Sequence, residues 1–211
     1  MANTRERRRL AMRARILDAA RELLQEEGYE AFSMRKLGER LDYAPSAVYR
    51  HFRDKAALLQ ALVDHDYTAF SAANAPSPTA NPVERIRQGA LGYVEFGLAH
   101  PDQYRLLFMT PPRGPGAPLS DRPSVPVGDP DVDRYASLRK AVAEALEDGR
   151  FRRDAGDAEL ITQALWATVH GVVSLHLIRE SQPWLDWRDA RETTATLVDA
   201  VLRGLAPPSG G

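Results

Sequence analysis

The sequence predicts an all-α fold, with an N-terminal three-helix head joined to a larger α-helical body. Apolar residues recur at the spacing of amphipathic helices along most of the chain, and no segment shows the apolar–polar alternation that is typical of strands. Prolines, glycines and capping residues divide the chain into segments that suit single helices. With 44% hydrophobic residues, a chain of 211 residues can bury a core in one domain or in two small ones.

The first helix is predicted within residues 10–28. Its apolar side chains follow the i, i+3, i+4, i+7 spacing, at Ile16, Ala19, Ala20, Leu23 and Leu24. Gly28 ends this pattern in the manner of a C-terminal cap. Residues 1–9 are polar and contain four arginines, so we expect a flexible basic arm. Such an arm is either a solvated tail or, beside a DNA-binding element, a contact with phosphates.

Two short helices joined by a tight turn are predicted in residues 33–52. Ser33 can cap the first helix by accepting a backbone hydrogen bond, and Leu37 and Leu41 lie four residues apart on one face. Asp42 and Tyr43 then interrupt this apolar spacing. Pro45 suits the first position of a second helix, because its missing N–H costs nothing there.

The second of these helices has two different sides. Val48 and Phe52 repeat the four-residue apolar spacing, whereas Ser46, Tyr49 and Arg50 project from other faces. Polar, aromatic and basic side chains outside the core are typical of a helix-turn-helix whose second helix enters the major groove of DNA. The pattern therefore predicts a DNA-binding element.

This segment, with residues 54–59 after it, resembles the DNA-binding segment of the tetracycline-repressor (TetR) family. The most specific part of the resemblance is Tyr49-Arg50-His51-Phe52 with Lys55 three residues later. Two positions depart from the family pattern. Asp42 stands where the family often has Gly in the turn, and Ala44 stands where Ser or Thr often caps the second helix. Asp tolerates the left-handed conformation better than most residues.

The resemblance implies a TetR-type DNA-binding domain over residues 10–70, with its helix-turn-helix motif at 33–52. Lys55 is either a solvated lysine or, as the resemblance implies, a contact to a DNA phosphate, and we favour the phosphate. Arg35, on the first helix of the pair, joins the residues available to DNA. The candidate DNA-binding residues are Ser33, Met34, Arg35, Pro45, Ser46, Ala47, Tyr49, Arg50, His51 and Lys55.

Charge is distributed unevenly along the chain. Residues 1–60 hold 13 Lys and Arg against 9 Asp and Glu, whereas residues 61–211 hold 15 against 20. This asymmetry suits a polyanion-binding head on an acidic body, although an accident of surface charge is the alternative. Cysteine is absent, which excludes thiol catalysis, disulfides and Cys-based metal sites. Because no secretory signal appears and the apolar stretch at 164–178 is too short to span a bilayer, we expect a cytoplasmic protein.

The middle of the chain alternates helices with proline-rich connections. Asp54 is a plausible cap for a helix that runs to about residue 70, and residues 71–82 form a linker with three prolines. The ligand-binding and dimerisation domain is expected over 82–205, with helices at about 83–99, after Pro101, and at about 132–148. Seven prolines and three glycines in the 21 residues from 111 to 131 predict a mobile loop.

Two helices are expected to close the chain. The first, at about 158–179, is apolar on nearly every face, and the second, at about 187–205, carries a continuous apolar stripe. A single chain of this length has few elements left to cover both surfaces, so we expect a homodimer. The candidate interface residues are Leu175, Leu197, Val198, Val201 and Leu202.

Trp166, His170 and Gly171 stand as Trp-x-x-x-His-Gly, which resembles the ligand-binding half of the Trp-His-Gly (WHG) subgroup of the TetR family. The segment His100-Pro101-Asp102-Gln103-Tyr104 resembles the same subgroup. His170 is either a core histidine satisfied by a neighbour or a polar group that faces a ligand. The candidate ligand-binding residues are Tyr93, Phe96, Tyr104, Phe108, Trp166, His170 and Val173.

No motif for a metalloprotease, an α/β-hydrolase, a P-loop or a dinucleotide site is present, so we expect no enzyme, no catalytic residue, no cofactor and no metal. The patterns together predict a repressor that binds a palindromic operator as a dimer and is released by a small apolar or aromatic effector. The rival hypothesis is an all-helical binding or scaffold protein in which the helix-turn-helix is a packing motif. The Arg5–Arg9 cluster and the Tyr49-Arg50-His51 face argue against this rival.

Overall fold

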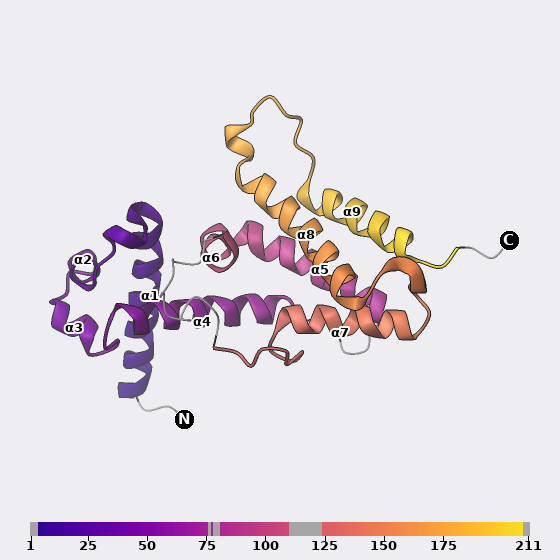
Figure 1. Ribbon diagram of the computed structural model, residues 1–211. Helices are drawn as coiled ribbons and strands as arrows, with labels where there is room; N and C mark the ends of the chain where they lie inside the picture. The colour runs from indigo at the N-terminus through magenta and orange to yellow at the C-terminus, as the bar shows by residue number, and fades with distance from the viewer. Residues whose placement is uncertain (1–3, 76, 78–80, 110–123, 209–211) are drawn as a thin grey trace. The chain divides into compact units, whose positions relative to one another are not determined.

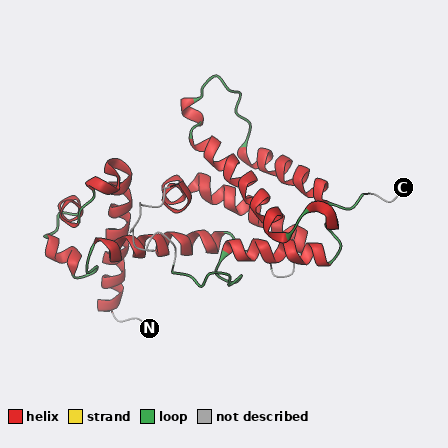
Figure 2. Cartoon of the chain, viewed as in Figure 1, coloured by secondary structure: helices red, strands yellow, loops and turns green. Residues whose placement is uncertain are grey.

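The computed structural model describes residues 4–75, 77, 81–109 and 124–208, and within these ranges it contains helices, turns and no strand (Figures 1 and 2). The all-α prediction is therefore confirmed. The α-helices are α1 (Thr4–Ala31), α2 (Met34–Arg40), α3 (Pro45–Tyr49), α4 (Lys55–Ala73), α5 (Pro82–Ala99), α6 (Pro101–Tyr104), α7 (Arg134–Glu147), α8 (Ala158–Leu177) and α9 (Ala190–Leu205). Short 3-10 or π-helical segments are η1 (Arg105–Met109), η3 (Arg153–Ala155) and η4 (Arg179–Ser181).

The chain divides into two compact units. The head comprises residues 1–68 and 102–124, and the body comprises residues 69–101 and 125–211. This division differs from the expected body domain at 82–205, because residues 102–109 pack with the head, where Leu106 lies against the head core. Of the loop expected at 111–131, residues 111–123 lie outside the described residues, and the rest forms bends and turns.

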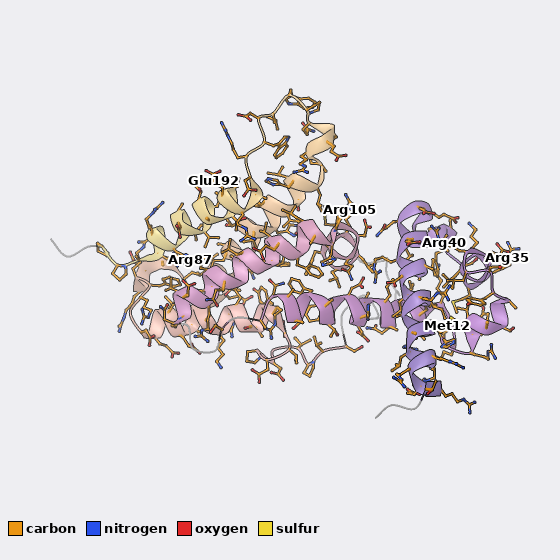
Figure 3. All side chains as sticks on the ribbon, turned by 180° about the vertical axis from the view of Figure 1, so that it is seen from behind. Met12, Arg35, Arg40, Arg87, Arg105 and Glu192 are labelled. Atoms are coloured by element: carbon orange, nitrogen blue, oxygen red, sulfur yellow. The ribbon has the colours of Figure 1, made fainter. Side chains whose placement is uncertain are left out.

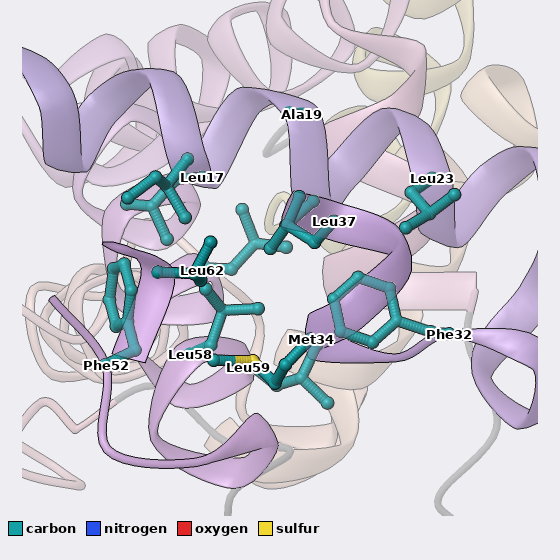
Figure 4. Packing of buried hydrophobic residues seen from close by; sticks show 13 residues of the cluster. Leu17, Ala19, Leu23, Phe32, Met34, Leu37, Phe52, Leu58, Leu59 and Leu62 are labelled. Atoms are coloured by element: carbon teal, nitrogen blue, oxygen red, sulfur yellow. The ribbon is translucent and has the colours of Figure 1, made fainter. Parts of the chain in front are cut away.

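An apolar core to which α1, α2, α3 and α4 all contribute stabilises the head (Figure 4). Ile16 of α1, Leu37 of α2 and Leu58 of α4 are almost completely buried in it. A helix as short as α3, with five residues, is not stable alone, so its place depends on this packing. The buried side chains of Val48 and Phe52 provide this packing, as their spacing predicts.

Local backbone features of the head match the sequence. The Ser33 hydroxyl accepts a hydrogen bond from the Lys36 N–H at 3.2 Å, and an Asp54 carboxylate oxygen accepts one from the Ala57 N–H at 2.7 Å. Asp42 adopts the left-handed conformation with φ 57°, which is the conformation that glycine would favour in this turn. Gly28 kinks α1 with φ 75°, three residues before the helix ends.

Residues 4–9 differ from the prediction of a flexible basic arm, because the structure continues α1 back to Thr4. Glu6 and Arg9, three residues apart, form a salt bridge at 2.7 Å on this first part of the helix. Arginine is also a strong helix former. The arginines at positions 5, 7, 8 and 9 are therefore fixed to one helix, where their side chains are exposed.

In the body, α5 packs on α7, α8 and α9, and α8 also packs on α7 and α9 (Figure 1). Tyr93, Val142 and Val173, from three of these helices, are buried between them. Arg85 of α5 pairs with Glu144 of α7, and Arg87 of α5 pairs with Asp199 of α9 at 2.7 Å. These ion pairs tie α5 to two of its neighbours at the surface of the unit.

By length and composition alone, α8 could cross a membrane, and no other helix in the described part of the chain meets those criteria. The stretch at 164–178, which we expected to be too short, is thus part of a longer apolar helix. Core helices of water-soluble proteins meet the same criteria, and α8 is in contact with α5, α7 and α9.

Candidate DNA interface and effector site

The two sides of α3 differ in exposure as the sequence predicts. Val48 on α3 and Phe52, three residues after its end, are 1% and 3% exposed, whereas Tyr49 is 51% exposed. Ser46 and Arg50 are exposed on the same helix or at its end. The structure therefore presents one polar, one aromatic and one basic side chain to the outside of the head, on the helix expected to enter the groove.

Arg35 extends this surface from α2, where its side chain projects outward (Figure 3). Its guanidinium makes a loose contact at 3.7 Å with the carboxylate of Glu39, one turn along the helix. Arg40, by contrast, is held against α1 by Glu26 at 2.5 Å. Of these two arginines on α2, Arg35 is the one placed to reach a ligand outside the head.

Several of the candidate DNA-binding residues have structural roles instead of exposed side chains. Met34, which we predicted as a DNA contact, is only 4% exposed, because its side chain packs in the head core. The Ser33 hydroxyl caps α2, and Ala47 is half-buried on α3. Pro45 is the first residue of α3, where its backbone starts the helix.

Lys55 has a partner within the head. Its ammonium group donates a hydrogen bond to the backbone carbonyl of Phe32 at 3.0 Å, and it lies 5.4 Å from the centroid of the Phe32 ring. The contact of Lys55 with a DNA phosphate, which the resemblance implies, stays a prediction.

His51 follows α3 in a basic environment. Its pKa is lowered from its ordinary value, first by burial and then by the positive charges of Arg50, Arg13 and Arg9. Arg13 also donates to the His51 carbonyl from Nη1 at 3.0 Å. The N-terminal part of α1 and the end of α3 thus form one basic surface, which favours the neutral form of His51.

In the body, three of the candidate ligand-binding residues form one hydrogen-bonded chain. The Trp166 indole N–H donates to the Tyr93 hydroxyl at 3.2 Å, and that hydroxyl lies 3.3 Å from His170 Nδ1. The direction of this second bond follows the tautomer of His170: with the proton of the neutral ring on Nε2 the hydroxyl donates to Nδ1, and with the proton on Nδ1 the hydroxyl accepts. Burial lowers the pKa of His170, which favours this neutral form.

Aromatic rings surround this chain. Phe70 lies edge-on to Tyr93, with ring centroids 5.6 Å apart, and 5.3 Å from Phe96. Tyr135 lies edge-on to Trp166 at 5.8 Å, and its hydroxyl donates to Glu159. The sequence analysis missed Phe70 and Tyr135. Phe70 falls at the end of the α4 periodicity, and Tyr135 follows the proline-rich segment, so no local pattern marked either residue.

The other candidate ligand-binding residues are not all in the body. Tyr104 and Phe108 belong to the head, where their ring centroids are 5.1 Å apart and Tyr104 is fully buried. Val173 is fully buried in the body. The body thus brings together Tyr93, Phe96, Trp166 and His170, and the structure places Tyr104 and Phe108 in a different unit.

The candidate dimer residues fall into two groups. Leu175 and Leu197 are 54% and 40% exposed, whereas Val198 and Leu202 are 1% and 6% exposed. Val198 and Leu202, which we predicted at the dimer interface, lie four residues apart on the inward face of α9, so their side chains pack inside the single chain. Val201 is half-buried. Leu160 on α8 and Ile178 just after its end add exposed apolar area.

Within the described ranges, no group of three or more His, Cys, Asp or Glu side chains is arranged to hold a metal ion. Asp54 caps α4, and Glu26 and Asp199 pair with arginines. The geometry thus provides a basic, exposed surface on the head and an aromatic, hydrogen-bonded cluster in the body.

Comparison with known proteins places both units in one group. A family model described as bacterial regulatory proteins, tetR family, matches residues 16–62. A second, described as tetracyclin repressor-like, C-terminal domain, matches residues 86–201. The chain is 31% identical over 143 residues to an HTH-type transcriptional repressor of Mycobacterium tuberculosis, a match that covers 68% of this chain and 66% of that protein.

It is also 37% identical over 75 residues to the HTH-type transcriptional repressor KstR of Rhodococcus jostii, over 36% of this chain and 35% of that protein. The matches thus span less than two thirds of the length of these two relatives. A solved structure of a bacterial regulatory protein in the tetR family from Rhodococcus has a TM-score of 0.69 and 22% identity, over 93% of this chain and 98% of that chain. That likeness shows the fold.

Proposed function

This chain belongs to the tetR family of bacterial regulatory proteins, and we propose that it is a cytoplasmic transcriptional repressor that binds a palindromic DNA operator as a homodimer and leaves it when a small effector binds. The observation that carries the DNA-binding part is the division of α3. Val48 and Phe52 hold the helix in the head core, while Tyr49 is exposed. A helix-turn-helix used only for packing requires no exposed aromatic and basic side chains.

Contacts with DNA are assigned by chemistry. Arg50 and Arg35 can each donate two hydrogen bonds to the edge of a guanine, and Tyr49 and Ser46 can contact bases or phosphates. The exposed arginines at the start of α1 supply phosphate contacts, which give affinity without sequence preference. The relatives named as repressors support the repressing sign of regulation.

Dimerisation is proposed through the outer faces of α8 and α9. Leu175 of α8, Ile178 just after that helix and Leu197 of α9 leave apolar area exposed in the single chain. A second copy can cover this area through a two-fold contact in which four helices pack together. Two heads related by that symmetry match the two halves of a palindrome.

Effector binding is proposed at the aromatic cluster of the body. Tyr93, Phe96 and Trp166 supply apolar rings, and His170 supplies a polar group that can fix the orientation of a ligand. We expect a largely apolar or aromatic molecule. Because effector and operator bind to one protein with linked equilibria, each must change the affinity for the other by the same factor.

The DNA-binding part is tested by selection from random duplexes, from which we expect a palindromic site. Recovery of no palindrome would refute operator binding. Mass spectrometry of small molecules released from the purified protein identifies the effector class. Trp166→Ala should then abolish the response to that molecule and leave operator binding without effector nearly unchanged. Loss of operator binding in this variant would mean that Trp166 stabilises the fold and has no separate role in effector binding.

A further inference from the structure

The C-terminal end of α3 is held by a residue from another helix. This helix has no side-chain hydrogen bond at its N-cap, Ala44, so it lacks one common source of stability. At its other end, Arg13 of α1 donates to the carbonyl of His51 at 3.0 Å. The guanidinium carbon of Arg13 lies 4.1 Å from the centroid of the Phe52 ring, which is itself buried.

The start of the helix-turn-helix carries the same arrangement. Lys55 of α4 donates to the carbonyl of Phe32 at 3.0 Å, and its ammonium lies 5.4 Å from the Phe32 ring centroid. Phe32 is buried and directly precedes Ser33, the cap of α2. Each end of the motif therefore has one cation, one backbone carbonyl and one buried ring, and the cations come from α1 and α4.

We propose that Arg13 and Lys55 are positioning residues that fix the two ends of the 33–52 motif to α1 and α4, so that α3 is presented to DNA in one orientation. A hydrogen bond from a cation to a carbonyl is stronger than one between neutral groups, and a cation also gains from the face of an aromatic ring. This inference rests on the proposed DNA binding. It differs from the phosphate contact that the family resemblance implies for Lys55.

The salt dependence of binding separates the two roles. Each phosphate contact that is lost flattens the slope of log affinity against log salt concentration by about 0.9. A lost positioning contact weakens binding at all salt concentrations and leaves most of that slope in place. The two roles therefore predict different slopes even where the loss of affinity is the same.

The first experiment uses the palindromic duplex that the wild-type protein selects. Arg13→Gln should weaken binding by about tenfold, the value of one charge-assisted hydrogen bond, with a slope close to that of the wild type. Arg13→Lys keeps the charge but loses the planar guanidinium, so it should also weaken binding. Arg8→Gln removes an exposed charge from the same helix and should flatten the slope. Lys55→Met should behave like Arg13→Gln.

The second experiment needs no DNA, so it gives a result even if operator binding fails. Amide hydrogen exchange is measured in the intact, unliganded protein. Arg13→Gln should speed exchange at Arg50 and Phe52, whose N–H groups bond within and just after α3. Lys55→Met should instead speed exchange at Lys36 and Leu37, and Arg8→Gln should change neither pair.

The proposal is overturned if Arg13→Gln and Lys55→Met each flatten the slope by about 0.9 while exchange in α2 and α3 stays at the wild-type rate. Faster exchange at the matching end of the motif, with the slope retained, supports it.

Discussion

The head and the body are both helical, but their functional residues are placed by contacts of different range. In the head, Val48 and Phe52 are buried and Tyr49 is exposed because of their spacing along a few residues of chain. In the body, Tyr93 is joined to Trp166 and His170 by hydrogen bonds between residues more than 70 positions apart. The comparison shows that local spacing determines which side chains of this motif face outward, whereas the body cluster depends on how whole helices pack.

The two units also differ in how deeply these ion pairs are buried. The head buries Asp66 of α4 completely, where it accepts two hydrogen bonds from Arg21 of α1 at 3.0 and 2.5 Å and one from Gln103 at 3.0 Å. The body keeps its pair between Arg87 and Asp199 partly exposed to solvent. A buried charge is costly unless all its partners are present, so the head depends more strongly on its ion pair than the body does.

The largest effect is expected from a charge on the inward face of α9. Val198→Asp places a carboxylate at a fully buried position and should destabilise the body by several kcal/mol, about 3 to 5 for an unpaired buried charge. Leu197→Asp is the matched control, because the adjacent side chain is exposed. It should leave the body folded and produce monomers, as judged by circular dichroism and sedimentation. A folded Val198→Asp protein would contradict the assignment of the two faces.

The next effect tests the buried ion pair of the head. Asp66→Ala leaves the Arg21 guanidinium without its main partner and should cost about 3 kcal/mol or more of unfolding free energy. Asp199→Ala in the body should change the denaturant midpoint little, because the pair it breaks is solvated. Equal losses in the two variants would remove the contrast between the units.

A smaller loss is expected in the aromatic cluster. Tyr93→Phe removes one hydroxyl that bonds both Trp166 and His170, while the ring keeps its contact with Phe70. We expect a cost of about 1 to 2 kcal/mol, the range for two neutral hydrogen bonds. Thermal unfolding measures it. An unchanged melting temperature would mean that water replaces the hydroxyl without cost.

The sequence determines more of the head than of the body. Ser33, Asp54, Asp42 and Gly28 act on their own backbone, so their roles in the structure could be derived from residue type and position. The inward position of Val198 could not be derived in this way, because both faces of α9 carry apolar residues. Periodicity alone does not say which face packs inside the chain and which is left for a second copy.

Contacts between residues far apart in the chain account for the other features of the structure that the sequence did not predict. No local pattern indicates that Lys55 donates to the Phe32 carbonyl, 23 positions away, or that Arg13 donates to the His51 carbonyl, 38 positions away. The same holds for residues 102–109, which follow α5 directly in the chain yet pack with the head. Their place is set by the packing of Leu106 and the bond from Gln103 to Asp66.

The smallest effect concerns the two histidines and their response to pH. Both His51 and His170 have a pKa lowered in the folded protein, so the folded state binds fewer protons than the unfolded chain. Their contribution to stability is therefore intact above the unfolded pKa of about 6.5 and is lost as pH falls from there through the folded pKa. His51→Gln and His170→Gln should each make unfolding less sensitive to pH in this range.

Salt distinguishes the two histidines, because the causes of their shifts differ. Burial lowers the pKa of both, but at His51 the charges of Arg50, Arg13 and Arg9 add to it. Salt screens charges and leaves burial unchanged. In NMR titrations, the pKa of His51 should rise toward its ordinary value when the salt concentration is raised, and the pKa of His170 should change less. Arg13→Gln should raise the pKa of His51 at low salt only. If both histidines respond equally to salt, the basic surface at the end of α3 does not act on His51, and burial alone sets both values.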